Sequence, residues 1–176
     1  MPKLKRLSYT SRALYTARGP RPPASQPPLN EWRDMRASGE ERLLTIDVLL
    51  NQHDELRALS SRLDALVRQP VPDPKSLSPI RHAMSSLMRK HLTLEDELVY
   101  SPLRAHAETS AEMRRSDADL APRRQAYSSH VVAWTPERIT SDWSGYRRGV
   151  TVLTEGLTSR IDYETDILYP LLDRLR

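Results

Sequence analysis

HLTLEDELVYSPL, residues 91–103, and RIDYETDILYPLL, residues 160–172, follow the same plan. In each stretch a glutamate stands four positions after a polar first residue, and a tyrosine and a proline follow it. This spacing places the first residue and the glutamate on the same face of a helix. The first residue differs, because the earlier copy has His91 and the later copy has Arg160. We therefore expect two helices that each present a carboxylate and a second polar group to one shared space.

Apolar residues recur at helical spacing around both copies and in two further segments. The pattern predicts helices over 39–68, from about 78 to about 102, within 110–134, and from a start between 136 and 146 to about 175. Alternation typical of strands and hairpin dipeptides between apolar runs are absent from the sequence. Long amphipathic helices joined by short breaks favour an all-α fold, an antiparallel up-down four-helix bundle.

Prolines mark the expected helix ends. Ser78-Pro79 has the form of a cap followed by a first-turn proline, so we expect the second helix to begin there. Pro102 is expected to stop or kink that helix, and Pro122 to kink or start the third. In the last helix, Gly149 and Gly156 stand seven positions apart on one side, which would allow close contact with another helix.

The length of 176 residues suits one domain with additional tail sequence. Residues 38–176 carry the helical pattern, whereas residues 1–37 are basic and rich in proline and are expected to form an irregular N-terminal extension, a solvated tail. The tail has no apolar run typical of a secretory signal, and no stretch is long and apolar enough for a membrane helix. With a net charge of only +4 and no cysteine, we expect a cytoplasmic protein without a membrane or nucleic-acid partner.

Polar residues interrupt the apolar face of every predicted helix well inside its length. They are His53, His91 with Glu95, His130, and Arg160 with Glu164. A lone inward histidine is more often a hydrogen-bonded core residue than a metal ligand. However, buried carboxylates are unfavourable unless they are paired or bind a metal, and here all the helices carry such interruptions. The set therefore predicts a metal site of nitrogen and oxygen donors, for which iron is the natural ion and manganese or zinc are alternatives. His82 and His106 are expected at the surface.

These residues resemble the hemerythrin-like (HHE cation-binding) family over about residues 40–176. The matching pieces are His53 in LLNQHDELRAL, His91 and Glu95 in HLTLEDELVYSPL, His130 on the third helix, and Glu164 in YETDILYPLL. The resemblance implies that these five residues are ligands of a non-heme di-iron centre, with a single iron as the alternative. The family usually has histidine where this chain has Arg160, and arginine cannot act as a ligand because it stays protonated.

The resemblance implies a protein that binds or activates O2 or another small diatomic molecule. The reduced number of histidines favours an oxidase or oxygenase with a small-molecule substrate over a simple carrier. In that reading Arg160 and Tyr163 are the candidate catalytic residues, because a guanidinium and a phenol can donate hydrogen bonds to an oxygen ligand or to an anionic substrate. Two alternatives stay open: a non-catalytic module that binds or senses O2, nitric oxide or iron, and a metal-free bundle that acts through protein contacts.

Overall fold

The computed structural model describes residues 39–175, and every regular element in that range is helical. In chain order the elements are α3 (Gly39–Val67), α4 (Pro74–Glu95), η1 (Asp96–Tyr100), α5 (Ser101–Arg104), η2 (Ala107–Thr109), α6 (Ser110–Ala133), α7 (Pro136–Ser141), α8 (Trp143–Tyr163), η3 (Glu164–Leu168) and α9 (Tyr169–Asp173). The predicted all-α class is confirmed. The predicted N-terminal extension lies outside the described residues.

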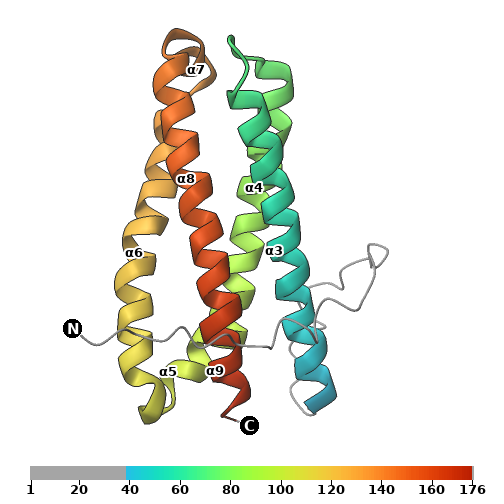
Figure 1. The fold of residues 1–176 in the computed structure, drawn as a ribbon, viewed down its shortest axis with the longest axis vertical. Helices are drawn as coiled ribbons and strands as arrows, with labels where there is room; N and C mark the ends of the chain where they lie inside the picture. The colour runs from blue at the N-terminus through green and yellow to red at the C-terminus, as the bar shows by residue number, and fades with distance from the viewer. Residues whose placement is uncertain (1–38, 176) are drawn as a thin grey trace, which may run out of the picture. The chain divides into compact units, whose positions relative to one another are not determined.

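The long helices α3, α4, α6 and α8 pack as a bundle within the described part of the chain (Figure 1). Helix α3 contacts α4 and α8, and α8 also contacts α6. The short helix α7 lies at one end of the bundle, and α5 and α9 lie at the other end, which we call the α5/α9 end (Figure 1). No helix in residues 39–175 is long and apolar enough to cross a membrane.

The first helix ends close to the predicted residue, but the second begins earlier than predicted. Helix α4 starts at Pro74, where the Asp73 side chain accepts hydrogen bonds from the backbone N–H groups of Lys75 and Ser76. Aspartate is a strong helix cap, and proline suits the first turn because its missing N–H would be unpaired there anyway. Pro79 therefore lies inside α4 and does not start it. Pro122 likewise lies inside α6, which continues through it.

Both copies of the repeated segment contain one turn of π-helix. The wide turn η1 follows directly after Glu95, and η3 begins at Glu164. Pro102 and Pro170 come just after these turns, in the first residues of α5 and α9. A π turn bonds residue i to residue i+5, which is the separation of each glutamate from the tyrosine that follows it. The copies therefore share a local backbone distortion as well as a sequence pattern.

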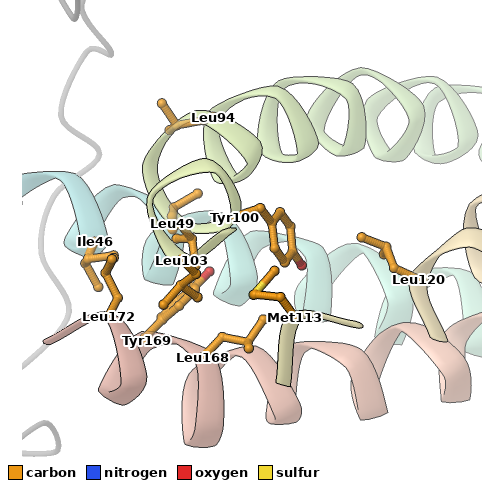
Figure 2. Close-up of a cluster of buried hydrophobic side chains, with 11 residues drawn as sticks. Ile46, Leu49, Leu94, Tyr100, Leu103, Met113, Leu120, Leu168, Tyr169 and Leu172 are labelled. Carbon is orange, nitrogen blue, oxygen red and sulfur yellow. The ribbon is translucent and has the colours of Figure 1, made fainter. Parts of the chain in front are cut away.

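The apolar core is divided along the bundle axis. The cluster at the α5/α9 end includes Leu49, Leu94 and Leu168 together with the rings of Tyr100 and Tyr169 (Figure 2). A small middle cluster consists of Leu56, Leu87 and Ile161, and a third lies towards α7, around Trp134 and Tyr146. His53, His91 and Glu164 fall in sequence between residues of the first and middle clusters, and Glu95 follows Leu94 of the first cluster. One polar layer therefore lies between two apolar ones.

Gly149 and Gly156 of α8 face α6, which is the close contact with another helix that their spacing allowed. A Cβ atom on Gly149 would lie 2.9 Å from Cε1 of His130, and one on Gly156 would lie 3.2 Å from a guanidinium nitrogen of Arg123. The Arg123 side chain also donates a 2.8 Å hydrogen bond to the Gly156 carbonyl. Small residues thus allow α6 and α8 to approach closely.

Candidate metal centre

The polar layer brings four of the predicted ligands together. His53 from α3, His91 and Glu95 from α4, and Glu164 from the start of η3 each place one donor atom within 4.8 Å of all the others. All four side chains are buried, and Glu95 is fully inaccessible to solvent. Two imidazoles and two carboxylates in this arrangement form a nitrogen and oxygen donor set that could hold a cation.

The histidines face the carboxylates through their Nε2 atoms. Nε2 of His53 lies 3.3 Å from Oε2 of Glu164, and Nε2 of His91 lies 3.7 Å from Oε2 of Glu95. Nδ1 of His91 lies 3.1 Å from Oε1 of Gln52. A proton on Nδ1 would donate to that amide oxygen and leave the Nε2 lone pair facing the cluster, as second partners do for metal-binding histidines.

Burial, reinforced by the nearby His53, lowers the pKa of His91 to about 4. The ring is therefore neutral near pH 7. A neutral imidazole has the free lone pair that metal coordination needs.

The two oxygens of Glu95 differ in their hydrogen bonding. Its Oε1 atom accepts a long hydrogen bond of 3.4 Å from the Tyr169 hydroxyl, whereas its buried Oε2 has no hydrogen-bond partner among the described residues. Burial, together with the charge of Glu164, raises the pKa of Glu95 well above its ordinary value. An unpartnered carboxylate oxygen beside two imidazoles is unfavourable without a cation, and a metal ion would remove that penalty.

The two oxygens of Glu164 face different groups. Oε2 faces the histidines, at 3.3 Å from His53 and 4.0 Å from His91. Oε1 accepts hydrogen bonds from Nε of Arg160 at 2.5 Å and from the Tyr100 hydroxyl at 2.9 Å. Burial alone would raise the pKa of Glu164, but the hydrogen bond with His53 and the charge of Arg160 outweigh it and hold the pKa below its ordinary value. Glu164 is therefore ionised without a metal.

Arg160 is buried in a network of its own. One terminal nitrogen donates to the hydroxyls of Tyr100 and Ser116, the latter at 2.9 Å. The other terminal nitrogen has no hydrogen bond within the described part of the chain and lies 3.5 Å from the Asp119 carboxylate. The guanidinium carbon also lies 4.9 Å from the centre of the Tyr163 ring, within cation–π range. These contacts fix the guanidinium against Glu164.

The tyrosine of each copy donates a hydrogen bond to the glutamate of the other copy. Tyr100 of the first copy donates to Glu164 of the second, and Tyr169 of the second copy donates to Glu95 of the first. The Tyr169 hydroxyl also lies 3.3 Å from Nε2 of His53. Sequence reasoning did not include these tyrosines among the site residues. Their identical place in both copies was the available signal.

His130 does not join the cluster. It is half-buried on α6, where its ring lies 6.0 Å from that of Trp134 and 5.5 Å from that of Tyr146, both in the core towards α7. The α6 residue at the level of the site is Ser116, which bonds Arg160. His130 comes 14 residues later, which is about 21 Å along an α-helix. The position of α6 along the bundle thus corrects the placement expected from the sequence.

Tyr163 is close to the site but does not face the four donors. Its hydroxyl donates to the Glu112 carboxylate at 2.5 Å, and its ring contacts the guanidinium of Arg160. Burial and the Glu112 carboxylate raise the pKa of Tyr163 to about 12. Tyr127 hydrogen-bonds with Ser85 at 3.0 Å, and His82 and His106 are exposed as expected.

Comparison with known proteins agrees with this geometry. The family described as the hemerythrin HHE cation binding domain matches residues 44–172. Searches of curated proteins and of solved structures found no match. The matched range contains all four converging donors and both copies of the repeated segment.

Proposed function

The chain belongs to the hemerythrin HHE cation-binding family, and on that premise we propose that it holds iron at the four converging donors and binds or activates O2 there. The observation that carries the proposal is the buried oxygen of Glu95, which has no hydrogen-bond partner among the described residues and faces His91. Imidazole nitrogens and carboxylate oxygens suit iron, with manganese and zinc as alternatives. Iron would supply the redox change that O2 chemistry requires.

The surrounding side chains exclude water and hold protons in place. The apolar clusters on either side of the polar layer shield it from solvent. The Tyr169 hydroxyl lies between Nε2 of His53 and Oε1 of Glu95, where it can donate a hydrogen bond to either atom. Burial and the neighbouring carboxylates raise the pKa of Tyr169, so this proton is retained near neutral pH. These features favour an oxidase or oxygenase over a carrier.

The ion pair of Arg160 with Glu164 favours the other candidate, a metal-free bundle that acts through protein contacts. The pair satisfies Glu164 without a metal. It leaves Glu95 unsatisfied, however, and this asymmetry makes metal binding the stronger conclusion.

Anaerobic loading of the full chain with Fe(II), followed by removal of free metal and elemental analysis, tests the proposal. We expect at least about one iron per chain, with loss in His91→Gln and retention in His82→Gln, an exposed histidine of the same helix. Iron below about 0.2 per chain in the unsubstituted protein would exclude metal function and leave the metal-free bundle. Exposure of the loaded protein to O2, followed by its visible spectrum and O2 consumption, then tests the oxygen chemistry.

A further inference from the structure

We propose that this chain binds one metal ion, on the side of Glu164 that faces the two histidines, and that the guanidinium of Arg160 takes the place of a second ion on the other side. The inference rests on the proposed function, because it presumes that the cluster binds a metal. It differs from the di-iron centre that the resemblance implies.

The two oxygens of the Glu164 carboxylate face different sides of the site. A carboxylate that bridges two metals uses one oxygen for each of them. Here Oε2 faces His53 and His91, whereas Oε1 already accepts hydrogen bonds from Arg160 and Tyr100. Glu164 can therefore bind an ion through Oε2 without breaking its ion pair. A second ion at Oε1 would have to displace the guanidinium.

The Arg160 side of the cluster lacks nitrogen donors. The groups around the guanidinium are the hydroxyls of Tyr100 and Ser116, the ring of Tyr163 and the Asp119 carboxylate. The described part of the chain has three histidines outside the cluster; His82 and His106 are exposed, and His130 lies towards the α7 end. Arginine itself stays protonated and cannot act as a ligand. No set of donors for a second transition metal is therefore assembled there.

The charges of the buried groups support one ion. Two carboxylates, Glu95 and Glu164, lie in the polar layer, and Arg160 is the buried cation paired with the second of them. Oε2 of Glu95, which has no hydrogen-bond partner among residues 39–175, lies 3.7 Å from Nε2 of His91. One divalent ion placed between these groups would satisfy that oxygen. A second divalent ion would add positive charge beside a buried guanidinium, which is unfavourable.

The wild-type metal content tests the inference directly. The full chain is loaded anaerobically with Fe(II) and, in parallel, with Mn(II), and bound metal per chain is measured after free metal is removed. About one ion per chain, with the electron paramagnetic resonance spectrum of an isolated Mn(II), supports the inference. About two ions per chain, with exchange-coupled spectra, would overturn it while leaving the proposed function intact. Below about 0.2 ion per chain, both fail.

A gain-of-site variant tests the role of Arg160. The double substitution Arg160→His with Ser116→His supplies nitrogen donors from the two helices that meet at the guanidinium. We expect the metal content to rise from about one to about two ions per chain. Arg57→His is the matched control, because Arg57 pairs with Asp162 at the surface, and its metal content should stay unchanged. A folded double variant that still binds one ion would show that Arg160 does not occupy the position of a second metal ion. Circular dichroism checks that the variant is folded. If it is unfolded, the metal content of the wild-type protein still tests the inference.

Discussion

The two copies of the repeated segment share their local structure and differ in what they supply to the site. Each has a buried glutamate, a π turn next to it and a buried tyrosine. His91 in the first copy is neutral near pH 7 and faces the cluster through a nitrogen atom. Arg160 in the second copy is a permanent cation bound to its own glutamate. The same helical scaffold therefore holds a neutral imidazole in one copy and a fixed positive charge in the other.

This difference sets the state of each glutamate in the absence of metal. Arg160 and the histidine His53 hold the pKa of Glu164 low, whereas burial and the charge of Glu164 raise the pKa of Glu95. Without a metal, the surroundings of Glu95 therefore disfavour its ionised form. The surroundings of Glu164 favour its ionised form, because Arg160 supplies a counter-charge that is covalently part of the chain.

Replacing each glutamate in turn with neutral glutamine should give the largest difference in stability between the two copies. In metal-free protein at pH 7, we expect Glu164→Gln to lower the free energy of unfolding by about 3 kcal/mol, because it leaves the buried guanidinium of Arg160 without its counter-charge. Glu95→Gln should change it by less than about 1 kcal/mol, because burial and the charge of Glu164 disfavour the ionised form of Glu95, and the substitution removes no paired counter-charge. Urea denaturation with a chelator present measures both. Both variants should lose metal binding.

A large loss of stability in Glu95→Gln would contradict this asymmetry. It would mean that Glu95 is ionised and bonded without metal, as Glu164 is. Equal small losses in both variants would instead show that Asp119, which lies 3.5 Å from the guanidinium, compensates for Glu164.

The first residues of the copies should differ in their response to acid. The pKa of His91 is about 4 in the folded protein and about 6.5 in an unfolded chain, so the unfolded state binds the proton more tightly. The contribution of neutral His91 is complete above about pH 6.5 and is lost as the pH falls to about 4, by up to about 3 kcal/mol. Arg160 does not titrate in this window. We expect the metal-free protein to lose stability on acidification through this term.

Urea denaturation between pH 4 and 7 measures the effect, with His91→Gln lacking this part of the pH dependence. His82→Gln is the control, because His82 lies exposed on the same helix. If both substitutions leave the pH dependence unchanged, His91 is not the buried neutral histidine that the geometry indicates.

Helical periodicity was sufficient to find the clustered donors of α3, α4 and η3 but not the contribution of α6. His53, His91 and Glu164 each interrupt a clear apolar face, so extending that face places them in the core. Helix α6 has few buried residues, and nothing in its own pattern determines that Ser116, and not His130, stands at the level of Arg160. That position depends on contacts with α5 and α8, which are tertiary.

The inward direction of the tyrosines was also hidden from the sequence. A projection at 3.6 residues per turn places residue i+5 well away from the face of residue i. A π turn changes that relation, and it brings Tyr100 and Tyr169 into the polar layer after Glu95 and Glu164. The repeated tyrosine can be read from the sequence, but the π turn that directs its side chain inward cannot.

Removing each tyrosine hydroxyl in turn should give the smallest difference in stability between the two copies. Tyr100 bonds Glu164 at 2.9 Å and also accepts from Arg160, whereas the bonds of Tyr169 to Glu95 and His53 are longer, at 3.4 and 3.3 Å. We expect Tyr100→Phe to lower the free energy of unfolding of the metal-free protein by about 1.5 kcal/mol, and Tyr169→Phe by about 0.5 kcal/mol.

Tyr127→Phe, which loses a half-buried bond to Ser85, provides the reference for an ordinary tyrosine hydroxyl. The test is the order of the two losses in the free energy of unfolding. We expect the larger loss for Tyr100, because its hydroxyl hydrogen-bonds both members of the buried ion pair of Arg160 with Glu164. If Tyr169→Phe is the more damaging, the Glu95 side is already held together without metal. A network that needs an ion to complete it should lose little stability when one of its long hydrogen bonds is removed. A larger loss in Tyr169→Phe would therefore show that the second copy is not the more stable of the two in the metal-free protein.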